Sequence, residues 1–156
     1  MFKSVQRVSY LVKNRDKMVA YIERTFGMRP DNLVDEYRER GSGVRPGKLI
    51  NEGEGYLREA HYRVGPTLLR ITEPVPGTEG AQFLQKNGPG LFRVSWGVSN
   101  IPEVAQQLKA KGITLREDER GYHQDHLGPN QIDIDVDPED SDSLGVFFQL
   151  IEDDPK

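Results

Sequence analysis

One short pattern occurs twice in this chain and constrains its fold more than any other feature. Arginine, valine, serine, an aromatic residue, any residue and valine follow one another at positions 7–12 and again at positions 93–98. In a β-strand, whose side chains point alternately to opposite faces, the arginine and serine of each copy share one face. Two copies of one strand pattern in different halves of the chain indicate an internal duplication.

The order of the predicted elements also favours a duplication, because both halves contain a strand, a helix, a long loop and then two or three strands. The first helix has an apolar stripe at helical spacing, formed by Met18, Ile22 and Phe26. Suitable caps flank both helices, with Asn14 and Gly27 in the first half and Asn100 and Gly112 in the second. We expect strands at residues 5–12, 56–64, 67–73, 91–98, 132–137 and 146–152, and a short helix at 80–86.

Two segments lack the pattern of a strand or a helix. Residues 29–55 are charged and contain Arg-Pro, Gly-Ser-Gly, Pro-Gly and Gly-Glu-Gly, which is long for a plain connection. We expect this segment to form a lid over a site or a mobile loop. An acidic loop at residues 116–130 follows the helix of the second half.

The composition limits the classes of function. The chain has 156 residues, of which 35% are hydrophobic and 29% charged, so we expect a small core under a heavily charged surface. A net charge of -4 does not favour nucleic acid as a partner, and the absence of cysteine excludes disulfides and thiolate chemistry. No apolar run approaches the roughly 20 residues of a membrane span, and the N-terminus lacks a signal-peptide pattern, so we expect a cytoplasmic protein without membrane contact.

Three stretches resemble a known family, namely Thr25-Phe26-Gly27, residues 83–91 (FLQKNGPGL) and residues 145–150 (GVFFQL). They are similar to the vicinal oxygen chelate superfamily, which includes glyoxalase I, extradiol dioxygenases and bleomycin-resistance proteins, and most similar to its methylmalonyl-CoA epimerases. The resemblance implies an α+β fold in which two tandem βαβββ modules form a curved mixed sheet around a cleft. It implies one domain over residues 1–156, with module one at 1–75, a linker helix at 76–90 and module two at 91–156. It also implies a homodimer.

The resemblance also locates the metal ligands of the superfamily, which are a histidine, a glutamine or glutamate, a second histidine and a glutamate on four different strands. The corresponding positions of this chain hold Arg7, Arg70, Arg93 and Gln149. Arginine stays protonated and offers no lone pair, so it cannot ligate a cation. We therefore expect neither a metal nor another cofactor at these positions.

Taking those positions as facing the cleft, the alternation of strands adds neighbouring polar residues. The predicted substrate-binding residues are Arg7, Ser9, Arg70, Arg93, Ser95 and Gln149, with Thr72 beside them. The same alternation brings Glu59 and His61 to the cleft in module one, and Asp133 and Asp135 in module two. The resemblance implies an acid–base glutamate at or beside Glu59, and His61 is the second candidate for proton transfer.

Two interpretations of the arginines remain open. They could clamp a carboxylate, phosphate or enolate oxygen by bidentate hydrogen bonds, or they could form internal salt bridges with the acids. His123 and His126 form a weaker candidate metal site, because a histidine pair in a loop with glycine and proline is usually solvated.

Our first functional hypothesis is a metal-independent isomerase, epimerase or lyase that acts on a small anionic or acyl-type substrate. The second is a protein without catalytic activity that sequesters such a ligand, as bleomycin-resistance proteins do. The third is a metal-dependent enzyme with relocated ligands, drawn from Glu59, His61, His123 and His126.

Overall fold

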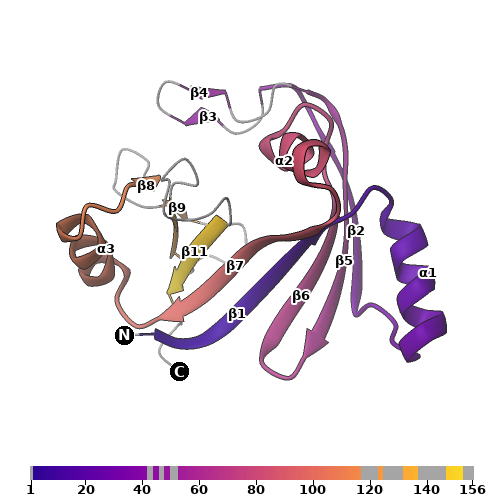
Figure 1. Ribbon diagram of the computed structural model, residues 1–156, viewed down its shortest axis with the longest axis horizontal. Coiled ribbons are helices and arrows are strands. Elements are labelled where there is room, and N and C mark those ends of the chain that lie inside the picture. Colours follow the sequence, from indigo (N-terminus) through magenta and orange to yellow (C-terminus); the bar gives the residue numbers. More distant parts are fainter. Residues whose placement is uncertain are drawn as a thin grey trace. The chain divides into compact units, whose positions relative to one another are not determined.

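The computed structural model describes residues 2–41, 44–45, 48–49, 53–116, 123–124, 132–136 and 147–152. The chain divides into two compact units. We call Val8–Phe92 the N-terminal unit, and Met1–Arg7 together with Arg93–Lys156 the C-terminal unit. Each unit is described by itself below, and Figure 1 gives the labels of the elements.

The N-terminal unit contains a sheet in which β5 is central. Its strand order is β2-β5-β6-β1, and β5 pairs antiparallel with both β2 and β6. In this register Glu59 lies opposite Val34 on one side and Thr72 on the other, while His61 lies opposite Arg70. The strands are β1 (Phe2–Leu11), β2 (Asn32–Arg38), β5 (Gly55–Val64) and β6 (Thr67–Glu73), and a separate short pair is formed by β3 (Val44–Arg45) and β4 (Lys48–Leu49).

Helix α1 (Arg15–Phe26) packs against β5 and β6 (Figure 1). Asn14 caps it by accepting a hydrogen bond from the Lys17 amide at 2.8 Å, and Gly27 ends it with a φ of 67°, which favours glycine. The core beneath the helix consists of Val12, Ile22, Ala60, Tyr62 and Ile71. Because β5 alternates, Glu59 and His61 lie on the face of the sheet opposite to this core.

A second helix, α2 (Glu79–Asn87), follows β6 in the N-terminal unit. Thr78 is its N-cap and accepts a hydrogen bond from the amide of Ala81 at 3.3 Å. Helix α2 lies within residues 76–90, where the sequence predicts a linker helix. The module boundaries at residues 75 and 90 themselves stay a prediction.

In its described residues, the C-terminal unit has a mixed sheet and one helix. Its strand order is β1-β7-β11-β10-β8, with β9 paired to β10; β11 runs parallel to β7, whereas β10 is antiparallel to β11, β8 and β9. The core lies between β7, β11 and α3 and consists of Val98, Ile101, Val104, Ala105 and Leu150. The elements are β7 (Gly90–Val98), α3 (Ile101–Ala110), β8 (Leu115–Arg116), β9 (His123–Gln124), β10 (Ile132–Val136) and β11 (Phe147–Glu152).

The predicted fold class is confirmed. The chain is α+β and its sheet pairing is mixed. With the short strands β3, β4 and β9 left aside, the order strand, helix, three strands occurs twice, as β1-α1-β2-β5-β6 and as β7-α3-β8-β10-β11. The predicted strands at 67–73 and 91–98 agree with β6 and β7 to within one residue. The cleft between modules stays a prediction.

Two expectations from the sequence are wrong in the described residues. The segment 29–55 was expected to be a lid or loop, but Asn32–Arg38 forms β2 at the edge of the N-terminal sheet. Charged residues are common on edge strands, where they oppose unwanted pairing, and they hide the strand pattern. Phe26, expected in the apolar stripe of the first helix, is 65% exposed because it is the last helical residue.

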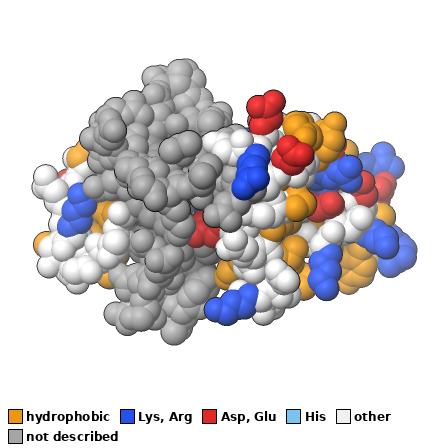
Figure 2. All heavy atoms as spheres, turned by 90° about the horizontal axis from the view of Figure 1, so that it is seen from above, with side chains coloured by type: hydrophobic (Ala, Val, Ile, Leu, Met, Phe, Trp, Pro, Cys, Tyr) orange, Lys and Arg blue, Asp and Glu red, His pale blue; other side chains and the backbone are white. Residues whose placement is uncertain are grey.

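The surface is heavily charged, as the composition predicts. Figure 2 shows acidic, basic and apolar side chains interspersed over the described part of the face that it draws. None of the described helices is both long and apolar enough to span a membrane.

Candidate functional site

Four polar side chains on β5 and β6 form a connected cluster on the sheet face opposite to α1. The carboxylate of Glu59 is at its centre and accepts hydrogen bonds from Arg70 at 2.7 Å and from the Thr72 hydroxyl at 3.2 Å. The same Glu59 Oε2 atom lies 2.8 Å from Nε2 of His61. We call Glu59, His61, Arg70 and Thr72 the Glu59 cluster.

The Glu59 carboxyl is held in its ionised form. The residue is only 5% exposed, and this burial on its own would raise its pKa. The hydrogen bond with His61 and the charge of Arg70 outweigh burial and lower the pKa from 4.5 to about 2. At neutral pH the group is therefore an acceptor of hydrogen bonds and has no proton to give.

His61 is oriented by its carboxylate neighbour. Its Nε2 is engaged by Glu59, and its side chain is 18% exposed. A proton exchanged with a ligand would therefore pass through the other ring nitrogen, Nδ1. A carboxylate partner fixes the tautomer of an imidazole and stabilises the imidazolium that forms when the ring accepts a proton.

Arg70 forms the internal salt bridge that was one of the two interpretations of the arginines. Its NH2 group is 2.7 Å from Glu59 Oε2, and its side chain is 21% exposed. Its Nε atom is buried and has no hydrogen-bond partner among the residues that the structure describes. Arg70 therefore neutralises Glu59 and still has guanidinium N–H groups directed elsewhere.

A second polar pair lies in the C-terminal unit. Ser95 and Gln149 are buried, lie opposite each other on the parallel strands β7 and β11, and are joined by a hydrogen bond from Ser95 Oγ to Gln149 Oε1 at 2.8 Å. Arg93 is two residues before Ser95 on β7, and Arg7, at the end of this unit's part of β1, is 4% exposed. These are the four predicted binding residues in this unit.

The remaining predicted residues belong neither to the Glu59 cluster nor to the Ser95–Gln149 pair. Ser9 is buried on the part of β1 that belongs to the N-terminal unit. The backbones of Asp133 and Asp135 pair with Ile151 and Gln149, and that of His123 pairs with Asp133, but the side chains of these three residues are outside the described part. His126 lies outside the described residues altogether.

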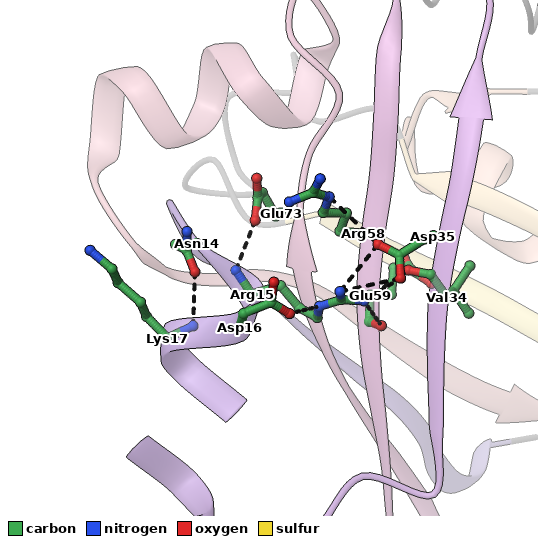
Figure 3. Close-up of polar contacts among 9 residues, drawn as sticks. All are labelled: Asn14, Arg15, Asp16, Lys17, Val34, Asp35, Arg58, Glu59 and Glu73. Atoms are coloured by element: carbon green, nitrogen blue, oxygen red, sulfur yellow. Dashed lines mark hydrogen bonds and ion pairs between the residues drawn. The ribbon is translucent and has the colours of Figure 1, made fainter. Parts of the chain in front are cut away.

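Sequence reasoning missed Arg15, which supports the cluster from the opposite side of the sheet. Figure 3 shows its guanidinium among the carboxylates of Asp16 and Asp35 and the backbone carbonyl groups of Val34 and Glu59. An arginine directly after an N-cap is usually solvated, and only the tertiary fold shows that this one is buried.

The residues at the superfamily's metal positions do not fit a metal ion. Arg70 is a donor already paired with Glu59, and the side-chain oxygen of Gln149 accepts the hydrogen bond of Ser95. Arginine offers no lone pair at the other two positions, Arg7 and Arg93. Within the described residues there is also no group of three or more histidine, aspartate or glutamate side chains that could hold a metal.

Comparison with known proteins gives matches among solved structures. No protein-family model and no curated protein sequence matches the chain. The methylmalonyl-CoA epimerase of Mycobacterium tuberculosis superposes with a TM-score of 0.70 at 20% identity, over 99% of this chain and 91% of that one. A variant of the Streptomyces coelicolor methylmalonyl-CoA epimerase, in complex with 2-nitronate-propionyl-CoA, gives 0.70 at 19% identity, over 97% and 95%. The chain has the methylmalonyl-CoA epimerase fold.

The epimerase fold is also found in a hypothetical protein from Bacillus halodurans, which matches with a TM-score of 0.71 at 17% identity over 98% of this chain and 96% of that one. The similarity to a vicinal oxygen chelate fold, seen in three short stretches of the sequence, is thus confirmed for the fold as a whole. The epimerase fold spans both halves of the chain, in agreement with the duplicated order of elements.

Proposed function

We propose that this protein is a metal-independent isomerase or epimerase that moves a proton on a carbon next to a carbonyl group, in a small anionic or acyl-type substrate. The observation that carries the proposal is the pairing of His61 with an ionised, buried Glu59 at 2.8 Å. A carboxylate–imidazole pair is a common proton-transfer device, and here a cation, Arg70, lies beside it.

In this proposal His61 transfers the proton and Glu59 orients it. A carboxylate with a pKa of about 2 is a poor base for a carbon acid. Nδ1 of His61 would take the proton from the α-carbon, and the bonding electrons would move onto the carbonyl oxygen as an enolate. Delivery of a solvent proton to the opposite face of that carbon, while His61 keeps the proton it removed, gives an epimer. Return of the proton by His61 to a neighbouring position gives an isomer.

The arginines would replace a metal ion as stabilisers of the enolate oxygen. A guanidinium offers several N–H donors to a developing negative charge. Electrostatic stabilisation of that kind is the largest single contribution to the rate enhancement of many enzymes. We assign substrate binding to Arg70 in the N-terminal unit, and to the other predicted residues Arg7, Ser9, Arg93, Ser95 and Gln149. In a substrate with a leaving group on the β-carbon, the enolate electrons would instead form a double bond and expel that group, which would make the enzyme a lyase.

Acyl-CoA thioesters are the first substrates to test, because solved structures with this fold include an epimerase in complex with methylmalonyl-CoA and NH4+. The protein would be incubated in D2O with acyl-CoA thioesters and with 2-oxo acids, and deuterium at the α-carbon would be followed by NMR. We expect His61→Gln to abolish the incorporation, Glu59→Gln to reduce it strongly, and the exposed control Arg29→Gln to leave it unchanged. If Glu59→Gln abolished it and His61→Gln did not, the base would be Glu59.

A second candidate function is sequestration of a ligand without chemistry. One observation favours it, since both carboxylate oxygens of Glu59 already accept hydrogen bonds from the protein's own groups. Tight binding of an acyl ligand, measured by calorimetry, without any deuterium incorporation would support this candidate over the isomerase.

Stoichiometric metal in the purified protein would instead support a metal enzyme with relocated ligands. The homodimer implied by the resemblance can be checked by analytical ultracentrifugation.

A further inference from the structure

Arg15 is a buried arginine with an unusual number of partners. It is the first residue of α1 and is only 5% exposed. Its Nε donates to Asp16 at 2.8 Å and its NH2 to Asp35 at 3.1 Å, while its backbone amide donates to Glu73 at 2.9 Å. Burial of a guanidinium is costly unless it is paired, and here two carboxylates compensate its charge.

The most informative contacts of Arg15 are those of NH1. This one nitrogen donates to the backbone carbonyl oxygens of Val34 at 3.1 Å and of Glu59 at 3.2 Å. Val34 and Glu59 are direct cross-strand partners of β2 and β5. Arg15 therefore links the start of α1 to both strands at the level of the residue whose carboxylate organises the Glu59 cluster (Figure 3).

The two sides of Glu59 are thus held by different groups. From the α1 face Arg15 binds the backbone carbonyl, and on the opposite face the carboxylate receives His61, Arg70 and Thr72. The contacts of Glu59 with His61 and Arg70, at 2.8 and 2.7 Å, are close enough to depend on direction, since a hydrogen bond weakens steeply when its donor angle is bent. A small backbone displacement at Glu59 would therefore alter the orientation of His61.

We infer that Arg15 is a positioning residue for proton transfer, which fixes the backbone of Glu59 and through it the direction of the His61 imidazole. This inference rests on the function proposed above. Arg15 lies on the face of the sheet away from the cluster, so it would affect the chemical step and not the affinity for the substrate.

The direct test replaces Arg15 with lysine, which keeps the charge but loses the planar fork that reaches Asp35 and both carbonyl groups. We expect kcat for deuterium incorporation to fall by about ten- to a hundredfold, while KM changes by less than about twofold. The matched control is Arg29→Lys, since Arg29 is an 81% exposed arginine that pairs with Glu23, and it should retain the kcat of the wild type.

A readout without substrate separates this inference from the proposed function. The ring N–H of His61, when bonded to Glu59, should give a slowly exchanging downfield proton signal in NMR, absent in Glu59→Gln. We expect Arg15→Lys to broaden or abolish the signal and Arg29→Lys to keep it. If no substrate exchanges deuterium but the signal still depends on Arg15, the proposed function fails, and only the orientation of His61 by Arg15 stands.

Two results would overturn the inference. One is a folded Arg15→Lys that keeps both the signal and kcat. The other is a loss of kcat that only matches the fraction of unfolded protein, which would make Arg15 merely structural. If Arg15→Lys does not fold, Asp35→Asn provides the second variant, because it keeps Arg15 and its carbonyl contacts but removes a compensating carboxylate. Asp35→Asn should then lower kcat by a smaller factor at unchanged KM, and an unchanged kcat would count against the positioning role.

Discussion

Glu59 links the stability of the protein to pH through a single buried carboxylate. Its pKa in the folded protein is about 2, below the ordinary value of 4.5 that applies to the unfolded chain. A group whose pKa is lowered by folding stabilises the folded state above the unfolded pKa, and this contribution is lost as the pH falls toward the folded pKa. The relevant window is therefore from about pH 5 down to about pH 2.

We predict that the difference in free energy of unfolding between wild type and Glu59→Gln is largest at neutral pH. It should shrink by up to about 3 kcal/mol as the pH falls through that window, because the wild type loses the carboxylate and the variant has none. Urea unfolding of both proteins at several pH values measures this difference. The contributions of all other carboxyl groups are the same in the two proteins and cancel in the difference. A difference that stays constant from pH 7 to pH 2 would contradict the low pKa.

Tyr62 provides a second prediction for a single residue. It is 1% exposed, and its hydroxyl has no hydrogen-bond partner within the described part of the chain. Burial raises the pKa of this hydroxyl, with a smaller contribution from Glu23. Tyr62→Phe should therefore keep or raise the free energy of unfolding, by up to about 1 kcal/mol, whereas Tyr10→Phe at a 41% exposed position should change nothing. Thermal and urea unfolding would show a loss above about 1 kcal/mol if the hydroxyl had a stabilising partner.

Among the elements, the two module helices begin in the same way. Asn14 and Asn100 have extended backbones, and their side-chain oxygens accept hydrogen bonds from Lys17 and Glu103 amides at 2.8 and 3.2 Å. The duplication therefore extends from the strand pattern to the cap of the helix that follows it.

We expect Asn14→Ala and Asn100→Ala each to lower the free energy of unfolding by about 1 kcal/mol, because each leaves a helix amide without its acceptor. The two losses should add within about 0.5 kcal/mol in the double variant, since the caps share no partner. Asn→Asp at the same positions keeps the acceptor and serves as the control. Chemical denaturation of all five variants checks this, and a strongly non-additive double variant would argue against independent caps.

The sequence was sufficient for elements with a regular period or a distinct cap, and insufficient where tertiary contacts decide. The resemblance together with strand alternation placed Glu59, His61, Arg70 and Thr72 on one face, and in the structure hydrogen bonds join these four side chains. It could not show that Arg70 pairs with Glu59, because that depends on the register of β5 against β6. Strand β2 was missed because polar edge residues mask its period, and Arg15 because its acceptors come from two other strands.

At the scale of the whole molecule, the proposed independence from metal can be tested at all four positions at once. The superfamily's metal positions hold Arg70 in the N-terminal unit and Arg7, Arg93 and Gln149 in the C-terminal unit. We predict that the wild type binds no stoichiometric cobalt, zinc or manganese, and that a chelator leaves its thermal midpoint unchanged.

The fourfold variant Arg7→His, Arg70→Gln, Arg93→His, Gln149→Glu restores the ligand types that the resemblance implies. We predict that it gains cobalt binding, measurable by absorption spectroscopy and by a rise in thermal midpoint with added metal. The threefold variant that keeps Arg70 is the matched control and should bind more weakly. A folded fourfold variant that binds no cobalt would count against the metal positions that the resemblance implies.

The salt bridge between Arg70 and Glu59 also constrains how such a chain could evolve. A change of Arg70 to glutamine alone would remove the charge that Glu59 depends on and leave a buried carboxylate with a raised pKa and lower stability. A change toward metal binding that began at Arg70 would therefore pass through a destabilised intermediate unless a second change came first. The carboxylate partner of Arg70 therefore disfavours the replacement of this arginine by a neutral residue in a single step.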